Sequence, residues 1–202
     1  KGIIRTDLDV VEIANIYEQE GLDLVSILTE EKFFKGSIDD LSKVSEKTKL
    51  SILCKDFIID SYQIYEAKLY GADAILLITA ILNQSQLKEF LEISKQLKMD
   101  TVVEIHDEEQ LKRALELGKD LEIIGINHRD LDDFSIDLQI TERLLPKIPK
   151  GKVIIAESGI EASSQIRKFK QLGVNGVLIG ESLMREKDIT GKLNEFRKAL
   201  LE

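Results

Sequence analysis

Residues 51–57 of the chain read Ser-Ile-Leu-Cys-Lys-Asp-Phe, a short apolar run that ends in a lysine and an aspartate. Residues 52–54 are typical of a buried strand, so Lys55 is expected where that strand ends. Burial favours the neutral form of a lysine, whereas a nearby carboxylate favours the charged form, and this balance suits a general acid. These seven residues alone fit a structural ion pair better, because such pairs also perturb pKa values. The rest of the chain must therefore show whether Lys55 is a general acid or part of a structural ion pair.

Short apolar strands alternate with amphipathic helices along the whole chain. The pattern predicts strands at residues 24–28, 52–54, 74–78, 101–105, 121–126, 152–156 and 176–179. It predicts helices at residues 9–20, 37–46, 60–69, 84–97, 107–115, 136–145, 161–172 and 190–201. Continuous apolar strands joined by helices indicate a parallel sheet covered by helices. Four helix ends also share a glycine followed two residues later by a polar residue, which supports a repeated unit. These glycines are Gly21, Gly71, Gly118 and Gly173.

Two architectures fit this alternation, an open doubly wound sheet and an eight-stranded βα barrel. No Gly-x-Gly-x-x-Gly motif follows the first strand, which weakens a dinucleotide-binding sheet. Polar residues follow strands along the whole chain, and only a barrel brings all strand ends to one mouth. These residues are Lys55, Glu104, Asn127, Glu157, Ser158 and Gly180. The sequence therefore predicts an α/β protein with a (β/α)8 (TIM) barrel fold.

The pattern contains seven strands, whereas a barrel of this kind has eight and begins with a strand. An open seven-stranded sheet would leave two unpaired edges, which invite aggregation. We therefore expect residues 1–202 to form a single barrel domain that is N-terminally incomplete, with its first strand before Lys1.

Composition and charge exclude several classes of protein. The chain has 202 residues, of which 43% are hydrophobic, as expected for one soluble globular domain or at most two small ones. Its net charge of -9 argues against binding to nucleic acid or to an anionic membrane, and its apolar runs are too short to span a membrane. The single cysteine excludes an internal disulfide and fits a reducing, cytoplasmic compartment. The two histidines belong to no cluster with zinc-site spacing.

Glycine-containing turns follow the last two strands, at residues 157–160 (Glu-Ser-Gly-Ile) and 180–182 (Gly-Glu-Ser). Such turns expose backbone N–H groups that can bind an anion, and barrels often hold phosphate after their seventh and eighth strands. Either turn alone fits an ordinary tight turn better. Both turns together at this place favour a phosphate site.

A lysine and a glutamate are candidates for acid–base chemistry. Glu104 shares one face of its strand with Val102 by alternation, and an acidic residue there is either the partner of a lysine or a base. Lys55, two strands away, can serve as that partner, which predicts a Lys/Glu acid–base pair in the barrel mouth. Asn127 and Arg129 follow the next strand, where the arginine suits a carboxylate or phosphate unless it is a surface residue.

Two phenylalanines lie just past strand ends. Phe34 and Phe57 are expected either to clamp an aromatic or apolar ligand or to plug the core. Three other candidates are weaker. His106 precedes a helix and is expected at its cap or on the surface, His128 is expected to point away from the ligand side of its strand, and Cys54 is expected in the core.

Six segments carry a family resemblance. They read ILTEEKFFKGS at residues 27–37, KDFIID at 55–60, VEIHD at 103–107, GINHRDL at 125–131, AESGI at 156–160 and GESLM at 180–184. In this order they resemble the indole-3-glycerol-phosphate synthase family, over essentially the whole chain. The resemblance implies a (β/α)8 barrel of the tryptophan pathway whose substrate, a carboxyphenylamino-deoxyribulose phosphate, loses CO2 and water as the indole ring closes. It implies no metal or organic cofactor, and other enzymes of the pathway as candidate partners.

The resemblance also implies roles for individual residues. Lys55 matches the catalytic lysine that protonates the ribulose carbonyl or its hydroxyl, and Glu104 matches a catalytic glutamate paired with it. Asn127 and Glu157 match residues that order the substrate and the charge network, and Arg129 matches a residue near the anthranilate end. The apolar slot for the aromatic ring is matched by Phe34, Phe57 and Leu76. The phosphate-binding turns are matched by Ser158, Gly159, Gly180 and Glu181.

The chain departs from the family pattern at two places. Many relatives carry serine where this chain has Glu181, whose charge would repel phosphate unless it points away. The family's first strand carries a further catalytic glutamate and lysine before a Ser-Pro-Ser turn, so Lys1, just after that turn, is not the catalytic lysine. Two alternatives stay open, a non-catalytic phosphate-binding barrel fragment and another phosphate-binding barrel such as a sugar-phosphate isomerase. Neither alternative needs a Lys/Glu pair together with an aromatic slot.

Overall fold

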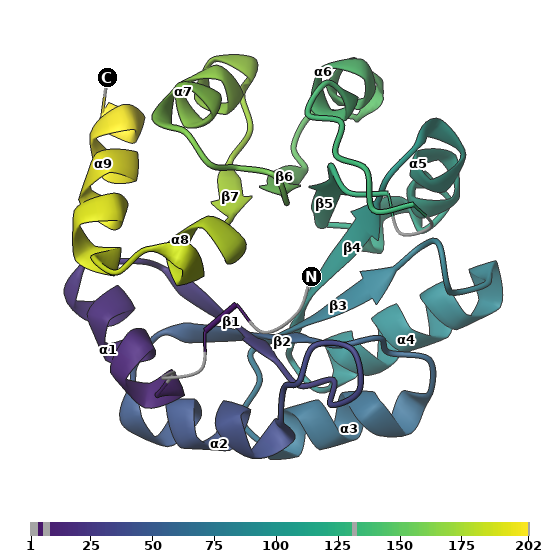
Figure 1. Cartoon of the computed structure of the whole chain (residues 1–202). Helices are drawn as coiled ribbons and strands as arrows, with labels where there is room; N and C mark the ends of the chain where they lie inside the picture. Colours follow the sequence, from purple (N-terminus) through teal and green to yellow (C-terminus); the bar gives the residue numbers. More distant parts are fainter. Residues whose placement is uncertain (1–3, 6–8, 131–132, 202) are drawn as a thin grey trace.

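The structure, a computed structural model, describes residues 4–5, 9–130 and 133–201. Lys1 and Leu131, which the sequence argument names, lie outside these residues. Seven parallel strands follow one another in chain order around the sheet. They are β1 (Leu24–Leu28), β2 (Ser51–Lys55), β3 (Ala74–Ile78), β4 (Asp100–Ile105), β5 (Ile123–Asn127), β6 (Val153–Glu157) and β7 (Gly176–Leu178). Figure 1 shows the strands at the centre of the molecule and the helices in a ring around them.

Helices connect the strands and cover the outside of the sheet. They are α1 (Val10–Gln19), α2 (Ile38–Lys47), α3 (Ser61–Leu69), α4 (Gln84–Gln96), α5 (Glu108–Leu115), α6 (Ile140–Leu144), α7 (Ser163–Leu172), α8 (Glu181–Arg185) and α9 (Ile189–Leu201). Short 3-10 helices lie at Gly118–Asp120 and Leu145–Lys147. The strands curve into a nearly closed barrel, which confirms the predicted (β/α)8 class, with the first of the eight strands not among the described residues.

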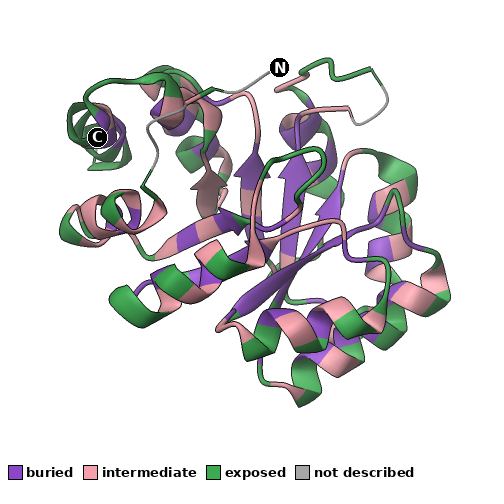
Figure 2. Ribbon diagram, turned by 60° about the horizontal axis from the view of Figure 1, so that its bottom comes forward, coloured by how far each residue is buried: buried purple, intermediate pink, exposed green. Residues whose placement is uncertain are grey.

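The barrel has two apolar layers, one on each face of the sheet. Ile52 and Cys54 pack outward under the helices, whereas Leu53 faces the barrel interior. The interior cluster consists of Leu53, Ala74, Leu76, Ile78 and Val102. Figure 2 shows that most of the sheet is buried and that the helices carry exposed residues on their outer sides. Strand alternation therefore sends Lys55, two residues after Leu53, to the inside of the barrel.

The repeated glycine turns have a structural reason at the bottom of the barrel. Gly71 and Gly173 adopt left-handed φ angles of 99° and 86°, which end the preceding helices. The polar residue two positions later then holds a neighbouring strand. Asp73 accepts a hydrogen bond from the backbone N–H of Ile52 at 2.9 Å, and Asn175 accepts one from that of Ile154 at 2.8 Å.

Three of the differences between the predicted and the observed elements have a physical reason. The helix predicted at residues 136–145 begins at Ile140, because an isolated antiparallel bridge pairs Ile136 with Arg129. The strand predicted from residue 121 begins at Ile123, after the 3-10 helix Gly118–Asp120. The helix Glu181–Arg185 lies where no helix was predicted. Five residues carry too little hydrophobic periodicity to reveal a helix.

Candidate active site

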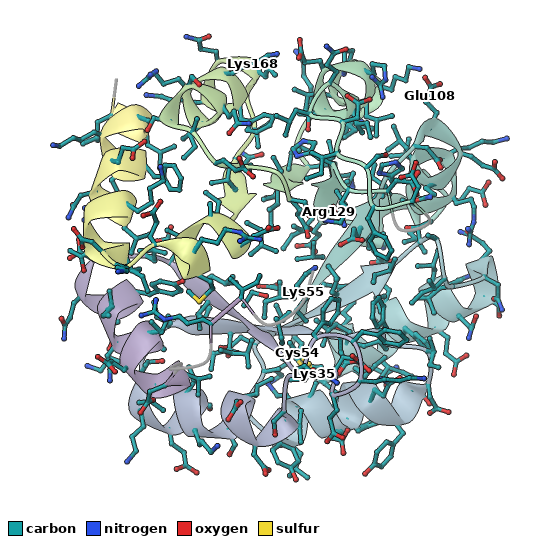
Figure 3. The ribbon with its side chains drawn as sticks, viewed as in Figure 1. Lys35, Cys54, Lys55, Glu108, Arg129 and Lys168 are labelled. Carbon is teal, nitrogen blue, oxygen red and sulfur yellow. The ribbon has the colours of Figure 1, made fainter. Side chains whose placement is uncertain are left out.

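Three charged side chains from three strands meet inside the barrel. Lys55 ends β2, Glu104 lies on β4 and Glu157 ends β6. Nζ of Lys55 lies 3.5 Å from Oε2 of Glu104 and 3.4 Å from Oε2 of Glu157. The two carboxyl side chains are 4% and 2% exposed, and that of Lys55 is 22% exposed. Figure 3 shows Lys55 near the centre of the ring of strands, with Glu108 and Lys168 on the outer rim.

The proton balance of this cluster follows from burial and charge. Burial alone would lower the pKa of Lys55, but the carboxylates of Glu157 and Glu104 outweigh burial and raise it. Lys55 therefore keeps its proton at neutral pH and has one to donate. Burial and the repulsion from Glu104 raise the pKa of Glu157 to about 7, although Lys55 opposes the shift. Glu157 can therefore take up or release a proton near neutral pH.

Gly125 on β5 provides the space for the carboxyl group of Glu157. A Cβ atom added at Gly125 would lie 2.1 Å from Oε1 of Glu157 and 3.0 Å from Cγ1 of Val102. That buried Oε1 has no hydrogen-bond partner among the described residues. A buried carboxylate oxygen without a partner is unfavourable, which agrees with the raised pKa of Glu157.

Asn127 and Arg129 lie beside this cluster. Asn127 is buried at the end of β5 and pairs in register with Glu157. Its Oδ1 accepts a hydrogen bond from the backbone N–H of Arg129 at 3.0 Å. The guanidinium of Arg129 donates to the backbone oxygen of Phe134 at 3.2 Å and lies 3.4 Å from Oε2 of Glu181. Figure 3 shows Arg129, like Lys55, inside the ring.

The two turns predicted to bind phosphate lie next to each other. Oγ of Ser182 donates to the backbone oxygen of Ile160 at 2.8 Å and so joins them. Ser158 and Gly159 both adopt left-handed conformations, with φ of 68° and 70°. A left-handed serine is uncommon and needs support from its surroundings. Gly159 is also crowded, since an added Cβ would lie 2.5 Å from Cγ2 of Ile136.

Glu181 is tied to two arginines. It follows Gly180 and begins α8, and its carboxylate lies 3.4 Å from the guanidinium of Arg129 and 2.9 Å from that of Arg185. Two guanidinium groups offset much of its charge. The repulsion of phosphate expected from the sequence is therefore weaker than for an isolated carboxylate.

His128 contacts the backbone of Ser158, the serine with the left-handed conformation. Its imidazole is fully buried, with Nδ1 2.9 Å from the backbone oxygen of Ser158 and Nε2 2.7 Å from Oγ1 of Thr141. A carbonyl oxygen only accepts, so Nδ1 carries the hydrogen in the neutral ring. Burial lowers the pKa of His128, which favours that neutral form. Strand alternation predicts that His128 points away from the ligand side. Its contact with the turn could not be predicted, because residue spacing does not reveal contacts between loops.

Three aromatic rings lie together in the loops that follow β1 and β2. The rings of Phe34 and Phe57 stack with centroids 5.1 Å apart, and Phe33 meets Phe57 edge-on at 6.1 Å. Phe57 packs against the interior apolar cluster that contains Leu76, which is 1% exposed. Phe34 is 38% exposed, so it does not plug the core. The structure brings Phe34 and Phe57 together beside the apolar cluster that contains Leu76, and it adds Phe33, which was not a candidate from the sequence.

Asp56 is engaged outside the charged cluster. Its Oδ2 accepts a hydrogen bond from Oγ1 of Thr29 at 2.5 Å, and its Oδ1 accepts one from the backbone N–H of Phe57 at 2.7 Å. These bonds join the ends of β1 and β2, together with a bond from the backbone N–H of Thr29 to the backbone oxygen of Lys55 at 3.2 Å. Asp56 thereby holds the turn that follows the lysine.

The expectations for two other residues have different outcomes. Cys54 is buried, as expected. His106 was expected to cap a helix or lie on the surface; it is partly exposed but does not cap the helix, and its Nδ1 lies 2.8 Å from the backbone oxygen of Asn127 and its Nε2 3.4 Å from Oδ2 of Asp130. Asp107 caps the helix instead, accepting from the backbone N–H of Gln110 at 2.8 Å.

Within residues 4–5, 9–130 and 133–201, no group of three or more His, Cys, Asp and Glu side chains is arranged to hold a metal ion. No helix in this part of the chain is long and apolar enough to cross a membrane.

Comparison with known proteins identifies similar sequences over nearly the whole chain. The family model for indole-3-glycerol phosphate synthase matches residues 1–196. Indole-3-glycerol phosphate synthase from Caldanaerobacter subterraneus subsp. tengcongensis is 50% identical over 198 residues, which cover 98% of this chain and 75% of that protein. The protein of the same name from Campylobacter jejuni (strain RM1221) is 49% identical over 188 residues, covering 93% of this chain and 72% of that protein.

Solved structures with low sequence identity share the architecture. The 3-hexulose-6-phosphate synthase from Salmonella typhimurium superposes with a TM-score of 0.76 at 15% identity, covering 98% of this chain and 96% of that one. KGPDC from Streptococcus mutans in complex with D-R5P superposes with a TM-score of 0.75 at 13% identity, covering 98% of this chain and 95% of that one. At these identities the likeness shows the barrel fold alone.

Proposed function

The chain belongs to the indole-3-glycerol phosphate synthase family, and we propose that Lys55, Glu104, Asn127 and Glu157 form the catalytic centre of its reaction. The protein is a carboxy-lyase of tryptophan biosynthesis. It converts 1-(2-carboxyphenylamino)-1-deoxyribulose 5-phosphate to indole-3-glycerol phosphate, releasing CO2 and water. The observation that carries the assignment of the centre is the buried contact of one lysine with two carboxyl groups.

Lys55 donates the proton that ring closure needs. The aromatic carbon that bears the carboxylate attacks the ribulose carbonyl carbon, and the carbonyl oxygen takes a proton as the new C–C bond forms. The carboxylate then leaves as CO2, which restores the aromatic ring. Because Glu157 and Glu104 keep Lys55 protonated, its ammonium is ready to donate when the oxygen gains negative charge.

Glu104 and Glu157 make the remaining proton transfers. Loss of the hydroxyl as water requires removal of a proton from the substrate and its transfer toward the leaving oxygen. Glu104 accepts the substrate proton and passes it to the leaving hydroxyl, which departs as water. Glu157, whose pKa is about 7, returns a proton to Lys55, which gave its own to the carbonyl oxygen. Asn127, buried beside Glu157, orients the substrate hydroxyl groups.

The two ends of the substrate have separate sites in this proposal. Phe34, Phe57 and Leu76 hold the aromatic ring, and Arg129 binds near its carboxylate. The phosphate lies at the turns after β6 and β7. Its backbone donors belong to Ser158, Gly159, Gly180 and Glu181. The bond between Ser182 and Ile160 that joins these turns supports their use as one site.

A direct assay tests the proposed function. Purified protein is mixed with the carboxyphenylamino substrate, and formation of the indole product is followed by its absorbance. We expect turnover with release of one CO2 per indole formed. Saturable binding of substrate or inorganic phosphate without any indole product would instead support a non-catalytic phosphate-binding barrel.

We also propose a cytoplasmic location and a single barrel domain. The buried, free thiol of Cys54 supports a reducing compartment. Other enzymes of tryptophan biosynthesis are the proposed partners, and co-purification with the tagged protein tests this. Recovery of the protein from a periplasmic or secreted fraction would contradict the proposed location.

A further inference from the structure

The loop between β1 and α2 is organised around one glutamate. The carboxylate of Glu30 accepts three backbone hydrogen bonds, from Lys32 at 2.9 Å, Phe33 at 2.5 Å and Phe34 at 3.1 Å. The backbone oxygen of Glu30 also accepts from the N–H of Gly36 at 2.9 Å, which closes the loop. One side chain therefore fixes the direction of the peptide that carries both phenylalanines.

The two phenylalanine rings on this loop are exposed, and few buried side chains pack against them. Phe33 is 70% exposed and Phe34 is 38% exposed, yet both contact the ring of Phe57 at the end of β2. Lys35, the next residue, has a left-handed φ of 56°, a conformation that is unfavourable for a lysine and must be held by its surroundings. Stacking on Phe57 alone holds the two rings only weakly. The position of these rings thus depends on the backbone beneath them.

We propose that Glu30 is a positioning residue: its carboxylate holds the Phe33–Phe34 backbone so that the rings, with Phe57, form the wall of the slot that receives the substrate's aromatic ring. This inference rests on the proposed function of the protein. Glu30 acts through the two phenylalanines, and the proposal gives it no proton to transfer.

The electrostatics of Glu30 agree with this arrangement. Slight burial would raise the pKa of its carboxyl group, but the backbone hydrogen bonds from Phe33, Phe34 and Lys32 outweigh it, and the pKa is lowered. The anion is therefore the form that the loop stabilises. Hydrogen bonds to a charged acceptor are stronger than neutral ones, so three of them on one carboxylate can order a short loop.

The first test separates the aromatic end of the substrate from its phosphate end. In Glu30→Ala we expect KM for the carboxyphenylamino substrate to rise on the order of tenfold, since the hydrogen bonds that order the slot are lost. The inhibition constant of inorganic phosphate, a competitor without an aromatic ring, should change less than twofold. Equal weakening of both ligands would overturn the proposal, because it would indicate general loss of structure.

Two variants control for side-chain removal as such. Glu30→Asp keeps a carboxylate able to accept from nearby backbone N–H groups, and we expect it to recover most of the lost KM. Glu18→Ala is the matched control, since Glu18 also accepts a backbone N–H, that of Lys49 at 2.8 Å, but at the end of α1. An increase of KM in Glu18→Ala as large as that in Glu30→Ala would contradict a specific role for Glu30.

A double-mutant cycle decides whether Glu30 acts through the ring of Phe34. We expect Glu30→Ala to raise KM in the wild-type background and to add less than about twofold once Phe34 is already alanine. Fully multiplicative effects would overturn the proposal. If the wild-type protein forms no indole product, the proposed function fails and the inference fails with it. If the wild type turns over and Glu30→Ala keeps a wild-type KM, only the inference fails.

Discussion

Glu157→Gln should change how the stability of the protein depends on pH. The carboxyl group of Glu157 is 2% exposed, and its pKa rises from 4.5 to about 7 on folding. Between these values the folded protein binds a proton that the unfolded chain has released. Stability therefore falls as pH rises from 4.5 through 7, and the full penalty is present above the folded pKa. The size of that penalty is roughly 3 kcal/mol at 1.36 kcal/mol for each pKa unit.

Urea unfolding at a series of pH values measures this penalty. A glutamine at residue 157 cannot ionise, so the variant lacks the penalty at every pH. We expect the free energy of unfolding of Glu157→Gln, relative to wild type, to rise by roughly 3 kcal/mol from pH 4.5 to pH 8.5. Titrating groups that do not contact Glu157 are the same in both proteins and cancel in the difference. A difference independent of pH would show that Glu157 titrates as an ordinary carboxyl group and would refute the reasoning.

Two further variants test the surroundings of the cluster. Gly125→Ala should reduce kcat by about tenfold or more with a small change in KM, because its Cβ would displace the Glu157 carboxyl group, now 2.1 Å from that position. A kcat within twofold of wild type would show that Glu157 can move without loss. His128→Gln should raise the KM for substrate, because the hydrogen bond that holds Ser158 at 2.9 Å is lost or weakened. Its stability relative to wild type should also improve as pH falls below about 6.5, because the lowered pKa of His128 makes only the wild type lose stability there. An unchanged KM and a flat difference in unfolding free energy from pH 7 to pH 5 would argue against both parts.

The barrel and the lysine could be predicted from the sequence because both follow from short-range periodicity. Apolar strands with a period of two place Lys55 and Glu104 on the inner face, and a parallel barrel makes them converge. Periodicity gives the face of a strand and no distances between strands. From the residues alone, Lys55 is therefore predicted to pair with Glu104. In the structure, Glu157 lies as close to Lys55 as Glu104 does.

The supporting residues could not be predicted for the same reason. The space that Gly125 leaves, and the hydrogen bond of His128 to the turn after β6, depend on how neighbouring strands and loops are packed. Glu30 lies within a recognisable motif, but the three N–H groups that it binds become apparent only once the loop is folded. The late start of α6, at Ile140, likewise follows from the bridge between Arg129 and Ile136, which hydrophobic periodicity does not reveal.

The role of Lys55 as proton donor is the central claim, and the rate of indole formation tests it most directly. Lys55→Ala removes the acid, and Lys55→Arg keeps a positive charge beside the two carboxylates but gives up its proton far less readily. Lys95→Ala is the matched control, because it breaks only an exposed ion pair of 2.5 Å with Asp120. We predict that both variants at Lys55 lose on the order of 10²-fold or more in kcat, while Lys95→Ala stays near wild type. A folded Lys55→Arg protein with a kcat close to that of wild type would contradict the account.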